Sequence, residues 1–153
     1  MMQKYKFCCG EWRGKDGLNQ GGNGMTQKYE IYKCEICGNI VEVTHEGGGE
    51  LVCCGQPMTK MVAKSTEEGN EKHLPVVEKA ERGTVIKIGS VPHPMEEKHY
   101  IEWIEVFMKD GKVMRIPLHP GDKPELHIGH AIEDLLEVRE YCNVHGLWSK
   151  KLV

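Results

Sequence analysis

Four cysteines near the start of the chain have the spacing of a metal site. Cys34 and Cys37 form a Cys-x-x-Cys-Gly motif, and the adjacent pair Cys53 and Cys54 is also followed by glycine. Two intervening residues let both sulfurs of a Cys-x-x-Cys pair reach one ion, and four thiolates favour tetrahedral zinc or iron. Cys53 and Cys54 can share an ion only if the chain turns sharply there, because neighbouring residues on a strand point to opposite faces. A disulfide-bonded module and a structural zinc ribbon are the alternatives.

A second set of candidate ligands is dispersed over three short motifs. They are Glu71-Lys72-His73, His93-Pro94-Met95-Glu96-Glu97-Lys98-His99 and Cys142-Asn143-Val144-His145. Histidine and cysteine bind iron, zinc and copper, so the three motifs together suggest a second metal site. Each motif alone is equally compatible with an ordinary role: a solvated loop histidine, a surface charge pair, or half of a zinc finger.

In this order, behind the cysteine motif, the three motifs resemble the desulfoferrodoxin family, the two-iron class of superoxide reductase. The resemblance covers roughly residues 26–150, which is nearly all of the chain except its N-terminal extension. It implies an all-β fold in which a small desulforedoxin-like domain is followed by an immunoglobulin-like β-sandwich. The family also implies a homodimer and two irons per chain.

The resemblance implies a role for each residue of the motifs. A tetrahedral iron is expected at the four cysteines: Cys34, Cys37, Cys53 and Cys54. The catalytic iron is expected to have four equatorial imidazoles and one axial thiolate, with its sixth position open: His73, His93, His99, His145 and Cys142. We expect no metal binding by the histidines outside these motifs: His45, His119, His127 and His130.

The implied reaction is the one-electron reduction of superoxide to hydrogen peroxide without production of dioxygen. Neutral imidazoles keep the ferrous state accessible, and the thiolate donates electron density from the opposite side. Lys72 is expected to attract superoxide, and Glu71 to close the sixth position once iron is ferric. A rubredoxin-like protein is the expected electron donor. The competing hypotheses are a structural zinc or rubredoxin-like electron-transfer protein, superoxide dismutation, and a generic β-sandwich binding module.

The elements that must position these residues are short strands separated by turns. From about residue 61 onward the chain alternates in period two, which favours a β-sandwich or barrel. Residues 131–138 also permit a helical turn, because their leucine and isoleucine spacing fits either period. The strands are expected at residues 29–33, 40–44, 50–53, 84–89, 100–108 and 112–118.

We divide the chain into three parts by composition. Residues 1–24 form a Gly-rich extension, residues 25–60 the four-cysteine domain, and residues 61–153 the catalytic domain. Cys8 and Cys9, in the extension, are candidates for metal binding or an intermolecular bridge, but the signal is weak because no Cys-x-x-Cys motif lies near them. A segment as short as the four-cysteine domain needs a bound metal or a cross-link to fold stably. Its hydrophobic core is too small to compensate the conformational entropy lost on folding.

The composition excludes several classes of function. The net charge of −3 gives no basic field for nucleic acid or an acidic membrane. No apolar run approaches the roughly 20 residues that span a bilayer, and the start of the chain lacks a secretory pattern. Seven cysteines, an odd number, fit metal binding in a reducing compartment better than a disulfide framework. We therefore expect a cytoplasmic protein.

Overall fold

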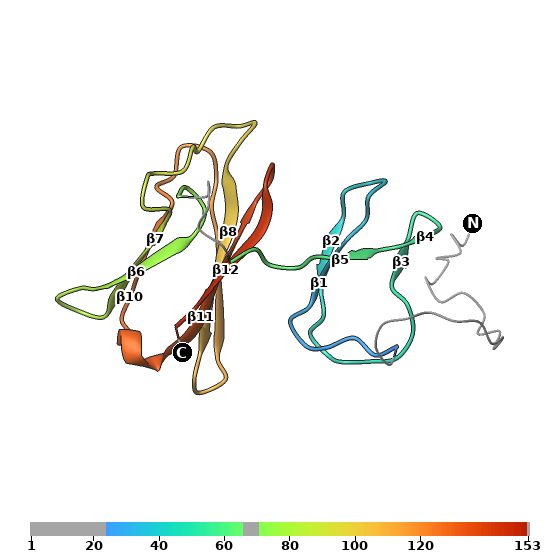
Figure 1. Ribbon diagram of the computed structural model, residues 1–153, viewed down its shortest axis with the longest axis horizontal. Coiled ribbons are helices and arrows are strands. Elements are labelled where there is room, and N and C mark those ends of the chain that lie inside the picture. Colours follow the sequence, from blue (N-terminus) through green and yellow to red (C-terminus); the bar gives the residue numbers. More distant parts are fainter. Residues whose placement is uncertain (1–23, 66–70, 153) are drawn as a thin grey trace, which may run out of the picture. The chain divides into compact units, whose positions relative to one another are not determined.

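The computed structural model describes residues 24–65 and 71–152. Within these ranges the regular secondary structure consists of β-strands and one 3-10 turn, which confirms the predicted fold class. No helix in these ranges is long and apolar enough to cross a membrane. The chain divides into two compact units, of which the first ends at Met61 and the second begins at Val62 (Figure 1). The predicted extension, residues 1–24 with their two cysteines, lies outside the described residues except for its last glycine.

The first unit contains two small antiparallel sheets. A three-stranded sheet has the order β2-β1-β5, and a separate hairpin pairs β3 with β4. The strands of this unit are β1 (Ile31–Lys33), β2 (Ile40–Glu42), β3 (Val52–Cys53), β4 (Gln56–Pro57) and β5 (Thr59–Lys60). None of them exceeds three residues, so few strand hydrogen bonds hold this unit together.

The β3–β4 hairpin explains how two adjacent cysteines reach one site. Cys53 pairs with Gln56, which leaves Cys54 and Gly55 as the two residues of the turn. Both have positive φ, 51° at Cys54 and 75° at Gly55, as a type I′ turn requires. The sharp turn expected at this point is therefore present.

The second unit is a sandwich of two antiparallel sheets, ordered β10-β7-β6 and β12-β11-β8-β9. A three-plus-four arrangement of this kind is typical of immunoglobulin-like domains. The strands are β6 (Pro75–Lys79), β7 (Thr84–Ile88), β8 (Ile101–Met108), β9 (Val113–Pro117), β10 (Glu125–Ile128), β11 (Leu135–Cys142) and β12 (Gly146–Lys151), with a 3-10 turn, η1 (Ile132–Asp134), before β11.

The core of the second unit lies between its two sheets. Alternate residues of β7, such as Ile86 and Ile88, face residues of β8 and β11, such as Ile104 and Val138, and all four are essentially unexposed. The same core cluster includes Cys142, at the end of β11. Residues 131–138 contain both structures that their spacing allows, because η1 is followed directly by β11.

The strand pairing brings three distant loops to one end of this sandwich. The first residue of β6, Pro75, pairs with the last residue of β7, Ile88. The last residue of β11, Cys142, pairs with the first residue of β8, Ile101. The segment before β6, the β7–β8 loop and the β11–β12 turn therefore share one end, and these are the segments that carry the three histidine motifs.

Candidate functional site

The four cysteines of the first unit have the geometry of a tetrahedral metal site. The sulfur–sulfur distances are 3.6 Å for Cys37 and Cys53 and 4.0 Å for Cys53 and Cys54. Metal–sulfur bonds of about 2.3 Å in a tetrahedron separate the sulfurs by about 3.8 Å, whereas a disulfide needs about 2.05 Å. None of these cysteines is bonded to another. The distances fit a four-thiolate ion and exclude a disulfide-bonded module.

The charges of this group also require a cation. Backbone amides of Cys37 and Ile36 donate to the sulfur of Cys34 and lower the pKa of that thiol to about 6. Hydrogen bonding to Cys37, followed by contacts with Cys53 and Cys34, raises the pKa of Cys54 to about 12. Four thiolates this close repel one another, so they deprotonate together only when a metal ion compensates the charge.

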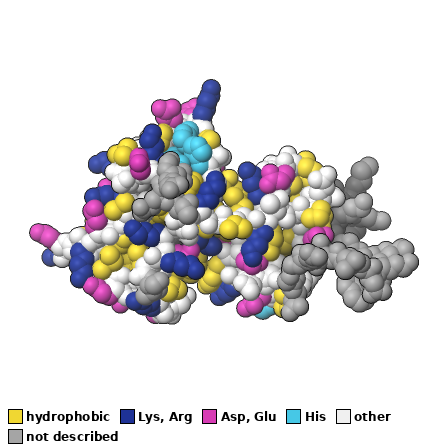
Figure 2. Space-filling model, in the orientation of Figure 1, with side chains coloured by type: hydrophobic (Ala, Val, Ile, Leu, Met, Phe, Trp, Pro, Cys, Tyr) yellow, Lys and Arg dark blue, Asp and Glu magenta, His cyan; other side chains and the backbone are white. Residues whose placement is uncertain are grey.

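In the second unit four histidines form a closed square. Neighbouring ring centroids are 4.6 Å apart for His73 and His93, 4.7 Å for His93 and His99, 4.8 Å for His99 and His145, and 4.7 Å for His145 and His73. Every contact is edge to face, with interplanar angles between 63° and 82°. Figure 2 shows histidine atoms gathered at one place on the surface of this unit. Such a ring matches four equatorial ligands around one ion.

The individual nitrogens are oriented for metal binding. Nδ1 of His93 lies 2.6 Å from the carbonyl oxygen of Pro94, which makes it the protonated nitrogen. The buried Nε2 of the same ring then has a lone pair and no partner among the described residues. Nε2 of His99 and Nδ1 of His145 are 3.1 Å apart, close to the roughly 3.0 Å expected between adjacent ligands with bonds of about 2.1 Å. The residues present therefore fit a metal ion.

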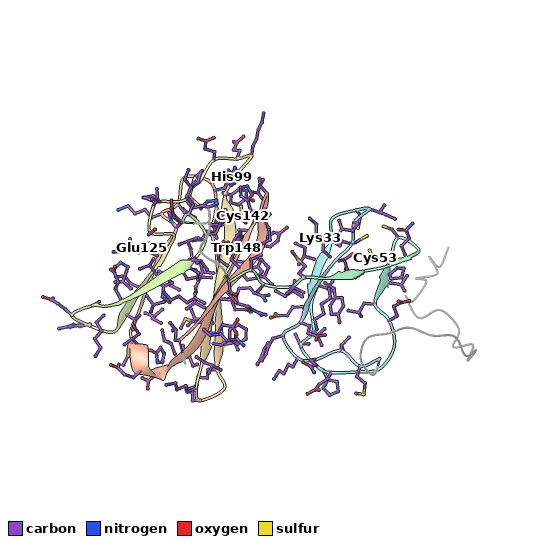
Figure 3. All side chains as sticks on the ribbon, in the orientation of Figure 1. Lys33, Cys53, His99, Glu125, Cys142 and Trp148 are labelled. Atoms are coloured by element: carbon purple, nitrogen blue, oxygen red, sulfur yellow. The ribbon has the colours of Figure 1, made fainter. Side chains whose placement is uncertain are left out.

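Cys142 closes the buried side of the square. Its thiol is completely unexposed, belongs to the hydrophobic core cluster, and lies 3.7 Å from Nδ1 of His145. The backbone amide of His145 donates to the same sulfur at 3.4 Å. The β8–β11 pairing is irregular between Tyr141 and Cys142, because β8 has one residue more than β11 at this point, while β11 keeps a regular register with β12 up to Cys142. Figure 3 labels His99, Cys142 and Trp148 at this end of the unit.

Exposure differs across the site in a way that leaves one side open. His73, His93 and Cys142 are buried, His99 is half-buried and His145 is exposed. With the sulfur on the core side, the position opposite to it faces solvent. Burial raises the pKa of the Cys142 thiol and lowers the pKa of His73 to about 3 and that of His93 to about 4. Both imidazoles are therefore neutral ligands at pH 7.

A buried carboxyl group contacts one histidine of this square. Oε1 of Glu140 lies 3.2 Å from Nδ1 of His73, and Glu140 is completely unexposed. Burial raises the pKa of Glu140 to about 9, so the pair is neutral in the metal-free protein, with Nδ1–H of His73 donating to the carboxyl oxygen. This bond leaves Nε2 of His73 as the free lone pair, the arrangement common for metal-binding histidines.

The Glu71-Lys72 turn lies directly against the β7–β8 loop. The carbonyl oxygen of Glu71 accepts hydrogen bonds from the backbone amide of Ser90 at 2.7 Å and that of Val91 at 3.3 Å. Gly89 has φ of 83°, and a Cβ there would lie 2.7 Å from the Cα of Lys72. Lys72 therefore packs against this loop through its backbone and directly precedes His73 of the histidine square.

The remaining histidines belong to neither group. Nε2 of His127 pairs with Glu125 at 2.6 Å, and Nδ1 of His119 lies 3.4 Å from Asp122. Within residues 24–65 and 71–152, two clusters of metal-binding side chains are present, and they contain none of the four histidines that we expected to stay free of metal. The two clusters contain all nine predicted ligands: Cys34, Cys37, Cys53 and Cys54 in the first, and His73, His93, His99, Cys142 and His145 in the second.

Comparisons with known proteins match both units. Residues 26–61 match the family model described as the desulfoferrodoxin N-terminal domain, and residues 65–151 match the model described as desulfoferrodoxin. The chain belongs to the desulfoferrodoxin family. This confirms the family prediction, and together with the two donor clusters it confirms the predicted pair of iron sites.

The similarity extends over most of this family member. The desulfoferrodoxin of Syntrophotalea carbinolica is 56% identical over 127 residues, which cover 83% of this chain and 99% of that protein. The superoxide reductase of Pyrococcus abyssi is 32% identical over 113 residues, covering 62% of this chain and 97% of that protein. The crystal structure of the superoxide reductase from Treponema pallidum superposes with a TM-score of 0.61 at 28% identity and covers 80% of this chain and 96% of that one.

Sequence analysis missed three residues beside the histidine square. Glu140 could have been found, because it lies two positions before Cys142 on the same strand and alternation puts both side chains on the core face. Trp148, whose ring stacks on His73 with centroids 4.7 Å apart, follows His145 closely in the chain. Lys64 had no signal at all, since only the folded chain brings it to Trp148.

Proposed function

We propose that this desulfoferrodoxin is a superoxide reductase, which converts superoxide to hydrogen peroxide with one electron and two protons and releases no dioxygen. The observation that carries the proposal is the closed square of four imidazoles over a buried thiol, with its outer side facing solvent. The relatives named superoxide reductase support it further.

We propose that each donor group holds one iron ion, the four cysteines in tetrahedral coordination and the His4Cys group as the catalytic site. When bound there, a ferrous ion would supply the single electron and an open position on the solvent side. The imidazoles of His73 and His93 are neutral at pH 7 because burial lowers their pKa, so they bind a cation without first losing a proton. Glu140 holds His73 in the required tautomer.

Lys72 is proposed to capture superoxide and to hold the water that donates protons to the product. A cation beside an open site raises the association rate of an anionic substrate by tenfold or more, and salt screens the effect. Lys72→Gln should therefore slow superoxide consumption about tenfold at low salt and flatten its salt dependence. The matched control is Lys109→Gln, which removes the same charge at the far end of β8. An equal rate of superoxide consumption for Lys72→Gln and the wild type would contradict the role of Lys72 in capture.

Glu71 is proposed to close the open position after oxidation. Its backbone is held by Ser90 and Val91, so its side chain starts from a fixed point beside the square. Glu71→Ala should change the visible spectrum of the oxidised protein more than the rate of superoxide consumption. An unchanged oxidised spectrum would contradict this role.

Three further features are proposals that follow from the family and from the composition. A rubredoxin-like protein is the proposed electron donor. A cytoplasmic location is proposed because an odd number of cysteines, seven, fits metal binding in a reducing compartment. A homodimer is proposed because β2 and β5 are edge strands of the small sheet, and pairing with a second copy would protect such edges. Light scattering of the purified full chain measures the oligomeric state directly.

The experiment that tests the function is metal analysis and visible spectroscopy of the anaerobically purified full chain, followed by superoxide kinetics. Two irons per chain, a band on oxidation that Cys142→Ser abolishes, and peroxide without dioxygen are expected. Release of dioxygen with peroxide would indicate dismutation instead. One zinc or iron per chain, without a band that depends on Cys142, would leave a structural or electron-transfer role.

A further inference from the structure

Lys64 is held against the last strand of the second unit by its backbone. Its amide donates to the carbonyl oxygen of Leu147 at 3.0 Å, and its own carbonyl accepts from the amide of Ser149 at 2.9 Å. These two bonds form an isolated parallel bridge with Trp148, which lies between the two partner residues. The start of the Lys64 side chain is therefore fixed next to the Trp148 ring.

The Lys64 side chain extends this contact to the histidine square. Its Nζ lies 5.0 Å from the centroid of the Trp148 ring, and this ring stacks on His73 with an interplanar angle of only 8°. The same Nζ donates to the carbonyl oxygen of His145 at 3.0 Å. The cation therefore contacts an indole that packs on one histidine of the square and the backbone of a second.

The exposed ammonium group lies close to the square. Its Nζ is 3.0 Å from the carbonyl oxygen of His145 and 5.0 Å from the centroid of the Trp148 ring, which stacks on His73. A positive charge this close disfavours an added positive charge on an ion that the four rings hold. It therefore favours the ferrous over the ferric state.

We propose that Lys64 is a positioning residue that holds Trp148 against His73 and raises the reduction potential of the catalytic iron. This inference rests on the function proposed above. A unit charge acting over about 9 Å, at an effective dielectric near 60, changes the ratio of ferrous to ferric protein about threefold. At 59 mV for each tenfold change in a one-electron couple, a threefold change corresponds to about 30 mV.

The test is a redox titration of the iron-loaded full chain, followed through the visible band that depends on Cys142. Lys64→Gln should lower the reduction potential by about 30 mV, which corresponds to the threefold change in the ratio of ferrous to ferric protein. Lys64→Glu should lower it by about twice as much, because it reverses the charge. Lys64→Arg keeps the charge and should restore the wild-type potential. Lys109→Gln and Lys109→Glu are the matched controls, because Lys109 follows β8 about 25 Å from the Cys142 end and its loss should shift the potential by less than half as much.

The outcomes separate this inference from the proposed function. A wild-type protein without a Cys142-dependent band would overturn the proposed function and the Lys64 inference with it. A normal band whose potential moves by less than half the expected shift in both Lys64→Gln and Lys64→Glu would overturn the role of Lys64 alone. A Lys64→Arg variant that shifts as far as Lys64→Gln would also overturn it, because packing rather than charge would then be the cause.

Discussion

Glu140 gives the sharpest test of how the chain holds its catalytic metal. Its carboxyl group is completely unexposed, and Oε1 is 3.2 Å from Nδ1 of His73. The perturbation is Glu140→Leu, which keeps about the same volume but removes the acceptor. Glu140→Gln is the matched control, because its amide oxygen still accepts from Nδ1–H of His73. Both variants remove the titratable group, so a difference between them reports the hydrogen bond.

The expected magnitude follows from the lost partner. A buried N–H left without an acceptor costs about 1–3 kcal/mol, and second-sphere partners of metal-binding histidines typically contribute 10–100-fold to affinity. In Glu140→Leu the ring of His73 is also free to carry its proton on Nε2, the nitrogen that faces the square. We therefore expect iron to bind the His4Cys group 10–100-fold more weakly in Glu140→Leu and within about threefold of wild type in Glu140→Gln.

The assay is anaerobic competition between the protein and a ferrous chelator, followed by the visible bands of each site after oxidation. The four-cysteine group is an internal reference, because neither variant touches the first unit. Its affinity should be unchanged while that of the His4Cys group falls. Equal affinities for Glu140→Leu and Glu140→Gln would refute the argument, since the hydrogen bond would then contribute nothing to the positioning of His73.

Three further predictions follow from the second unit. The metal-free protein should lose stability as the pH falls from about 6.5 to about 3–4. The folded state lowers the pKa of His73 to about 3 and that of His93 to about 4, so the unfolded chain takes up protons first. Urea unfolding at several pH values measures this, and a free energy of unfolding that does not change over this range would contradict it. Gly89→Ala should displace the Lys72 backbone, which its Cβ would meet at 2.7 Å, and so slow superoxide consumption as Lys72→Gln does. Glu105→Ala leaves two arginines around a buried site without their carboxylate and should lower the free energy of unfolding by about 3–5 kcal/mol, as urea titration would show; a loss under about 1 kcal/mol would contradict it.

The ligands of both sites could be predicted from the sequence because their chemistry is rare. A Cys-x-x-Cys pair followed by Cys53 and Cys54 has few uses where the cysteines of the described residues form no disulfides, and the sharp turn that the adjacent pair requires is present at Cys54. All six predicted strand ranges overlap observed strands, because they are rich in apolar, β-branched or aromatic residues and are bounded by turn residues. They are residues 29–33 (β1), 40–44 (β2), 50–53 (β3), 84–89 (β7), 100–108 (β8) and 112–118 (β9).

The strands outside the predicted ranges, such as β6 and β10, and the supporting residues depend on packing that no local pattern records. β10 (Glu125–Ile128) lies outside the predicted strand ranges, and its pairing with β7 defines it as a strand. Lys64 looks like an ordinary exposed lysine in the sequence. Only the parallel bridge to Trp148, a residue more than half of the chain length away in sequence, places Lys64 next to the histidine square.

The topology explains why ligands so far apart in sequence form one compact site. In antiparallel sheets the end of one strand lies beside the start of its neighbour, so loops that are distant in the chain meet at one end of the sandwich. Here β6 begins where β7 ends and β8 begins where β11 ends. The segment that carries His73, the loop that carries His93 and His99, and the turn that carries Cys142 and His145 therefore converge without any long connection. The rigid sandwich fixes the buried sulfur at the end of the core, and the loops add the imidazoles around it, which keeps the outer face open to a small anion.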